Sequence, residues 1–118
     1  MADEFSLTTG PFRAIAVQKQ DLRLSLDVSG YDEIDILLGV VQISGGGSAT
    51  VRIITGMQLE SDDGWVVAGT FNSVSTTNSW EKINIKNFLR YIRWEVSVLS
   101  GSSPTVTFVL PGMLRAWS

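Results

Sequence analysis

The segments "VQISGGGSATVRI" (Val41–Ile53) and "VSVLSGSSPTVTF" (Val96–Phe108) decide the fold, because one pattern occurs twice in 118 residues. Aligned without a gap, five of the thirteen positions are identical. The identical pairs are Val41/Val96, Gly46/Gly101, Ser48/Ser103, Thr50/Thr105 and Val51/Val106. In each segment, alternating apolar residues flank a Gly/Ser-rich centre that tolerates positive φ and can reverse the chain. This predicts two related halves, each a strand, a tip and a returning strand, packed face to face. The alternative is a chance recurrence of residues common in any β protein.

Alternation of apolar and polar residues extends through most of the chain. In "LRLSLDV" (22–28) the Leu and Val residues share one face, and in "RYIRWEVSV" (90–98) Ile92, Trp94, Val96 and Val98 do so. A period of two with many β-branched residues is typical of half-buried strands in antiparallel sheets. The predicted strands are 12–18, 21–28, 33–43, 49–57, 64–71, 80–86, 90–98 and 104–110. Eight short strands favour an all-β fold, an antiparallel β-sandwich of jelly-roll type.

The length fits one domain, which we divide into an N-terminal arm (1–11), a β-sandwich (12–111) and a C-terminal tail (112–118). Both ends contain large apolar residues, although free tails are normally polar. The candidate interface residues there are Phe5, Leu7, Phe12, Met113, Leu114 and Trp117. Either the ends fold back on their own domain, or they reach neighbouring copies. In the second case, deleting residues 113–118 would leave the sheet intact and abolish assembly.

Composition argues against several classes of partner. The net charge is −3 and the nine Lys and Arg residues are scattered, so we expect no nucleic-acid partner. No apolar run is long enough to span a bilayer, so we expect no membrane partner. The N-terminus "MADEFSLTTG" has neither a basic nor an apolar region, and we expect no signal peptide and assembly in a cytoplasm.

Catalysis has little support in the sequence. The chain has no His and no Cys, which excludes Ser–His–Asp and Cys–His arrangements as well as thiolate metal sites. We therefore expect no enzyme activity, no cofactor and no metal. The acidic stretch "ESDDGW" (60–65) could offer oxygen ligands to Ca²⁺, but Asp-Gly before an alternating run favours a hairpin turn. The second acidic stretch, "YDEID" (31–35), is interpreted as a solvated strand edge.

Aromatic residues beside turns support a second hypothesis, a carbohydrate-binding module. Its ligand platform would consist of Trp65, Trp80 and Tyr91 with the carboxylates of Asp62 and Asp63. The competing interpretation is that these side chains serve packing or subunit contact. Trp94 lies on the inward face of its strand and is predicted to be core.

From Leu37 onward, over about two thirds of the chain, the sequence resembles small all-β virion proteins of tailed bacteriophages and gene-transfer-agent-like particles. The matching features are "VVQISGGGSATVRI", "SDDGWVVAGTF" and "RYIRWEVSVLSGSSPTVTFVL". The group's hairpin has a spacer between Gly and Trp that is missing at Gly64–Trp65. A weaker similarity links the chain to discoidin-like and galactose-binding-like jelly rolls, which are typically longer and often closed by cystines.

The resemblance implies a non-enzymatic structural protein, a capsid decoration protein or another minor virion component. Its partners would be further copies of itself and other virion proteins, and it would be located in the virion. The carbohydrate-binding module is the alternative, with a glycan as its ligand. The sequence predicts neither the copy number nor a position in the head or the tail.

Overall fold

The computed structural model describes residues 2–117, which form nine β-strands and one short 3-10 turn, η1 (Leu22–Leu24). The strands are β1 (Ala2–Ser6), β2 (Phe12–Ala14), β3 (Gln18–Lys19), β4 (Leu26–Asp27), β5 (Glu33–Gly56), β6 (Val66–Thr70), β7 (Ser79–Ile85), β8 (Tyr91–Val109) and β9 (Pro111–Arg115). All named pairings are antiparallel. The predicted all-β fold is confirmed.

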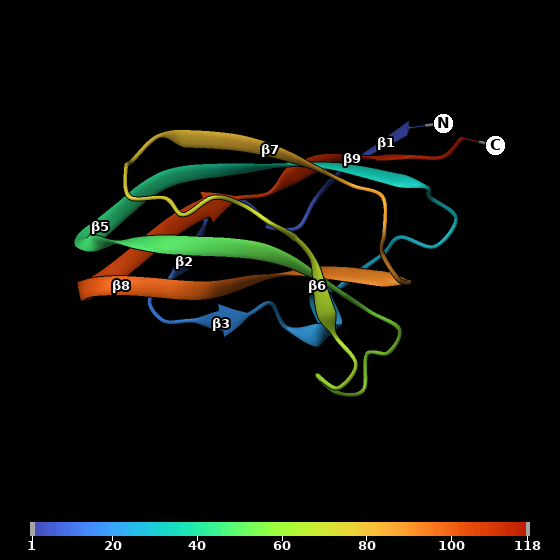
Figure 1. The fold of residues 1–118 in the computed structure, drawn as a ribbon, viewed down its shortest axis with the longest axis horizontal. Coiled ribbons are helices and arrows are strands. Elements are labelled where there is room, and N and C mark those ends of the chain that lie inside the picture. Colours follow the sequence, from blue (N-terminus) through green and yellow to red (C-terminus); the bar gives the residue numbers. More distant parts are fainter. Residues whose placement is uncertain (1, 118) are drawn as a thin grey trace.

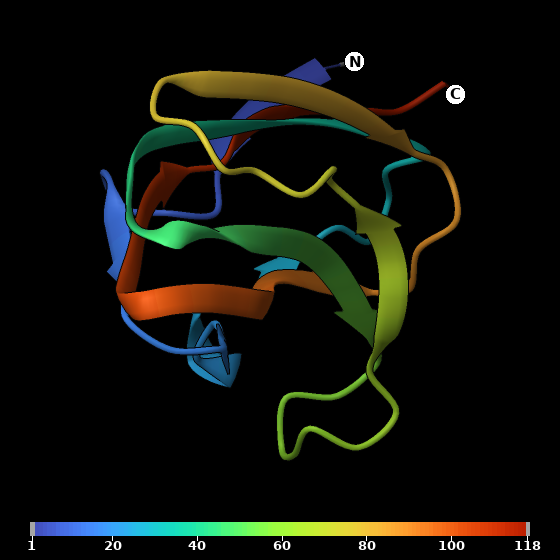
Figure 2. The ribbon, with the colours of Figure 1, turned by 60° about the vertical axis from the view of Figure 1, so that its left-hand side comes forward.

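One long two-stranded ribbon, β5 with β8, forms the body of the molecule. The pairing runs from Gly39 opposite Val109 to Gly56 opposite Tyr91. Both strands bend sharply at their Gly/Ser-rich centres, and the ribbon folds over on itself (Figures 1 and 2). The two tips predicted from the sequence are therefore present, and Gly46 of one lies opposite Gly101 of the other.

The pairing within this ribbon corrects the prediction of two separate hairpins. Each outgoing segment pairs with the returning segment of the other copy, so that Ile43 lies opposite Val106 and Val51 opposite Val96. The bend needs glycine because the two backbones nearly touch there. A Cβ at Gly47 would lie 2.1 Å from the Ser100 carbonyl oxygen. The recurring pattern reflects two strands that meet the same requirements at one bend.

The folded ribbon produces two layers. The first half of β5 lies between β7 and the second half of β8, which is flanked by β2. The second half of β5 lies between β6 and the first half of β8, which is flanked by β3 and β4. Figure 2 shows these layers one above the other. The chain thus passes between the two layers several times, with β3, β4 and β6 in one layer and β2 and β7 in the other, and β5 and β8 each contribute to both.

The core lies between the layers and includes an aromatic cluster. Trp94 is 2% exposed, as predicted, and its ring lies 4.7 Å from Phe12 and 5.2 Å from Phe108, measured between centroids. Val98 was predicted to share the inward face of Trp94, but it is 45% exposed, and Val41 at the corresponding approach to the bend is 41% exposed. Register shifts beside both positions, at the approach to the bend, interrupt the alternation.

The continuous strand predicted over 21–28 is not formed, because η1 occupies Leu22–Leu24 and only the short strand β4 follows it. The Asp21 carboxylate accepts a hydrogen bond from the Arg23 backbone N–H at 2.9 Å, and the Leu24 N–H donates to the Asp21 carbonyl. These local bonds favour a tight turn over a ladder. Consequently Leu24, predicted to point inward, is 65% exposed.

The two ends of the chain fold back on their own domain, which is one of the two alternatives that the sequence left open. The arm and the tail contribute β1 and β9, which pair with each other, and β9 continues along β5 from Ile36 to Glu33. Leu114 of β9 is 4% exposed and packs in the main core. The C-terminal segment is therefore a strand of the sheet. Met1 and Ser118 lie outside the described residues.

Replacing Leu114 with Ala should lower the free energy of unfolding by about 2–5 kcal/mol, the usual result of truncating a buried leucine. The measurement is urea denaturation followed by circular dichroism. The control is Trp117→Ala, since Trp117 is 70% exposed and its loss should change stability by less than about 0.5 kcal/mol. Equal stability of Leu114→Ala and the wild type would contradict the assignment of β9 to the core.

Candidate functional site

The six candidate interface residues at the chain ends do not form one surface. Leu7 and Leu114 are 5% and 4% exposed and pack in the chain's own core, as the alternative of ends that fold back on their own domain predicts. Phe5 and Phe12 are half-buried against that core, and Met113 is half-buried as well. Trp117 alone of the six is largely exposed, at 70%.

The predicted ligand platform is likewise divided. The Trp65 ring covers Gly56, which pairs with Tyr91, so these two aromatic residues lie near one end of β5. Trp80 instead covers Gly39 in the other layer and is 59% exposed. The platform therefore has no common surface.

Asp62 and Asp63, the two carboxylates assigned to the platform, differ in their partners. Asp62 forms an ion pair with Arg93, whereas the exposed Asp63 side chain has no partner among residues 2–117. Gly64 has φ +79°, consistent with the predicted Asp-Gly turn.

Arg93 is a residue that sequence reasoning missed. Its position in the strand predicts an outward side chain, yet it is 2% exposed. The guanidinium lies 4.4 Å from the Trp65 ring, donates to the Gln20 carbonyl at 2.8 Å and donates to the Asp62 carboxylate. Nε has no partner within the described chain. These contacts hold the 57–65 loop against β8, and no local pattern could have indicated this, because the three partners lie far apart in the sequence.

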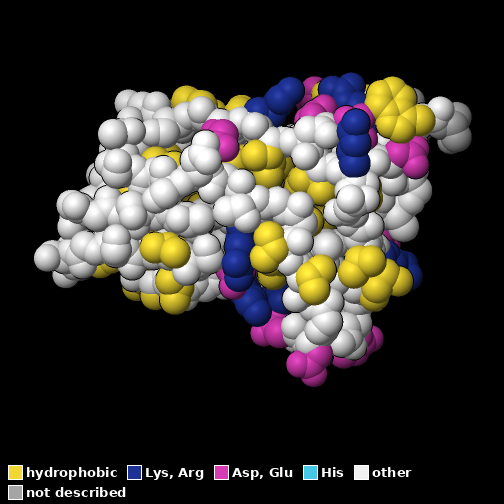
Figure 3. Space-filling view, viewed as in Figure 1, with side chains coloured by type: hydrophobic (Ala, Val, Ile, Leu, Met, Phe, Trp, Pro, Cys, Tyr) yellow, Lys and Arg dark blue, Asp and Glu magenta, His cyan; other side chains and the backbone are white. Residues whose placement is uncertain are grey.

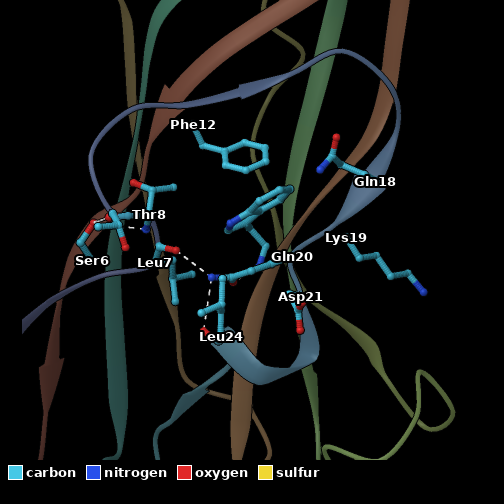
Figure 4. Close-up of a pocket in the computed structure, with 11 residues that line it drawn as sticks. Ser6, Leu7, Thr8, Phe12, Gln18, Lys19, Gln20, Asp21 and Leu24 are labelled. Carbon is cyan, nitrogen blue, oxygen red and sulfur yellow. Dashed lines mark hydrogen bonds between the residues drawn. The ribbon is translucent and has the colours of Figure 1, made fainter.

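A cavity of about 530 Å³ opens beside the aromatic cluster (Figure 4). Segments 6–12 and 18–24 form its walls, and Trp94 lines it from β8. The Gln20 side chain, which is 5% exposed, forms hydrogen bonds to all three parts. Its Nε2 donates to the Leu7 carbonyl at 2.8 Å and to the Leu24 carbonyl at 3.3 Å, and its Oε1 accepts from the Trp94 N–H at 3.2 Å. A fully bonded amide therefore fixes the cavity's shape.

A second feature is a surface without charge around the bend of the ribbon. We name it the neutral end, and it comprises residues 14–17, 41–51, 72–80 and 96–108, none of which is charged. In Figure 3 the end at left shows white and yellow side chains, while the dark blue and magenta ones lie toward the middle and right.

Hydrogen bonds and strand pairing hold the parts of the neutral end together. The Asn78 N–H donates to the Val40 carbonyl at 2.9 Å, and Ala49 pairs with Val74. Ala14 lies opposite Val106. Segments from four parts of the sequence thus form one continuous surface.

The described residues contain no group of three or more acidic side chains arranged to hold a metal ion. Across residues 2–117, no helix has the length and apolar character needed to cross a membrane.

No family model matches the chain, and no curated protein sequence matches it. Among solved structures it is similar to the SPBc2 prophage-derived protein YomS, with 15% sequence identity and a TM-score of 0.48. The match covers 97% of this chain and 92% of that one.

The Asp62–Arg93 pair should make stability depend on pH in the acid range. The hydrogen bond from Arg93 lowers the pKa of the Asp62 carboxyl below its ordinary value of 3.8, and desolvation opposes this shift. The pKa of Asp62 is lower in the folded state than in the unfolded state. The contribution of the ion pair to the free energy of unfolding is therefore complete above the unfolded-state pKa, and it is lost as the pH falls through the folded-state pKa. Asp62→Asn should therefore be less stable than the wild type at pH 6, and the difference should shrink below about pH 4.

Urea denaturation at a series of pH values measures this difference. The matched control is Asp63→Asn, whose side chain forms no ion pair in the described structure. It should follow the wild-type profile throughout. A pH-independent difference between Asp62→Asn and the wild type would show that the ion pair contributes nothing to acid stability.

Proposed function

We propose that the chain is a non-enzymatic structural component of a phage-like virion that acts by packing against further copies of itself and against other virion proteins. The observation that supports this most is the neutral end. Its crossover between β2 and β3 exposes apolar side chains, with Ile15 68% and Val17 58% exposed. A surface of this kind can be buried without desolvating a charge, and the cores of protein interfaces are depleted in charged residues.

The sequence resemblance supports the finer part of the proposal. The segments that resemble small virion proteins, from Leu37 onward, include both tips that form the neutral end. We infer a capsid decoration protein or other minor component, assembled in the host cytoplasm without nucleic acid or membrane as a partner. Its mechanism is modest apolar burial repeated by symmetry, so that many weak contacts stabilise a lattice.

The docking surface differs from the one expected at the chain ends. Leu7 and Leu114 serve the chain's own core, while the neutral end presents exposed apolar groups that this chain leaves uncovered. The carbohydrate-binding alternative through Trp65, Trp80 and Tyr91 lacks a shared platform. We therefore assign the contact between copies to the neutral end.

The double variant Ile15→Lys/Val17→Lys should dissociate the oligomer. Burial of each side chain contributes about 1.5–3 kcal/mol, so the dissociation constant should rise by more than about a hundredfold. Light scattering after size-exclusion chromatography measures the mass, and circular dichroism verifies the fold.

The control for this variant is Met57→Lys, which adds charge at a residue that is 62% exposed and lies outside the neutral end. Its mass should equal that of the wild type. Self-association through the neutral end is excluded if the wild type is monomeric at every concentration, or if the double variant keeps the wild-type mass. Binding to purified virion proteins would then be the remaining part of the proposal to measure.

A further inference from the structure

We propose that the cavity beside Trp94 binds a neutral saccharide of one or two sugar units. This inference does not rest on the proposed function, because it concerns residues outside the neutral end. The volume of about 530 Å³ lies within the range of small-molecule sites, about 300–1,000 Å³. The hydrogen-bonding groups around the cavity that lack a partner indicate the chemistry of its ligand.

Among the polar groups of the residues that line the cavity, the Trp94 indole N–H and the Gln18 amide lack a partner in the described chain. The Trp94 side chain is 2% exposed, and its indole N–H makes no hydrogen bond within residues 2–117. The indole nitrogen is nevertheless not fully enclosed by protein atoms. Trp94 lines this cavity, and we place its indole N–H at the cavity wall. The Gln18 amide also lacks a partner in the described chain, and in Figure 4 it extends over the cavity on the side of Phe12. Together they offer two kinds of donor and one acceptor.

The charged groups nearby do not point to an ionic ligand. The Asp21 carboxylate is occupied by Arg23, with Nε at 3.3 Å and Nη2 at 3.2 Å. In Figure 4 the Lys19 side chain extends away from the cavity. The Thr8 hydroxyl accepts from the Leu110 N–H at 3.4 Å and keeps its own proton for donation. A matching ligand therefore has both donors and acceptors and no net charge.

The apolar part of the cavity favours a puckered ring over a flat one. Phe12 and Trp94 are tilted by 54°, so they do not form a parallel slot for a planar base. Leu7 and Leu24 add aliphatic surface. A pyranose has an apolar C–H face and a rim of hydroxyls that both donate and accept, which matches an aromatic wall beside an amide and an indole N–H.

The experiment is an NMR titration of the ¹⁵N-labelled full chain with lactose, maltose, cellobiose and N,N′-diacetylchitobiose. The four indole N–H signals are assigned from the Trp65→Phe, Trp80→Phe and Trp117→Phe variants, which leaves Trp94. At least one disaccharide should shift the Trp94 signal in a saturable manner. Removing the amide with Gln18→Ala should weaken that binding about tenfold, equivalent to the loss of one or two hydrogen bonds.

The matched control is Gln42→Ala, because Gln42 is an exposed glutamine on β5 without a side-chain partner in the described structure. It should bind as the wild type does. The proposal is overturned if the Trp94 signal stays fixed at millimolar concentrations of all four sugars, or if Gln18→Ala binds as tightly as Gln42→Ala. A saturable shift at Trp65 or Trp80 in its place would also overturn the assignment to this cavity, as would binding of glucuronate but of no neutral sugar.

Discussion

The continuous pairing of β5 with β8 is the constraint on which the rest of the structure depends. Every other strand of the described chain except β1 pairs with one of these two, and β1 reaches them through β9. The ribbon can bury its apolar faces only by folding over, since its two halves must face each other to exclude water. Close backbone contact at the bend, where Gly47 approaches Ser100, makes this folding possible.

The requirements of the bend also shape the outer surface. A tight fold in two paired strands selects Gly, Ser and Thr, because larger side chains would collide or adopt unfavourable φ values. These residues carry no charge, so the sequence that permits the bend also produces the neutral end. The loop 72–80 and the crossover 14–17 extend it because they are anchored to the same ribbon. One local constraint thus determines both the shape of the sandwich and the uncharged character of the surface around its bend.

The N-terminal segment has a different role, which is to flank both halves of β8, with β2 along the second half and β3 and β4 along the first. It crosses from β2 to β3 and is held by the Gln20 amide, which bonds to Leu7, Leu24 and Trp94. Between this segment and β8 lies the cavity beside the aromatic cluster. On the other side of β8, Arg93 holds the 57–65 loop in a comparable way. Buried polar groups therefore position both peripheral segments on an apolar ribbon.

Alternation by itself determined the all-β class, the main strands and the inward position of Trp94, because a period of two has only one structural meaning when it repeats along a chain. The tip composition also determined where the chain reverses. Strand partners were decided only by the tertiary structure, since pairing between β5 and β8 depends on residues about fifty positions apart. For the same reason, the burial of Arg93 and Leu114 and the cavity beside Trp94 could not be predicted. The sequence period predicts to which face of its strand a side chain points. Which segment covers that face depends on the packing of the whole chain.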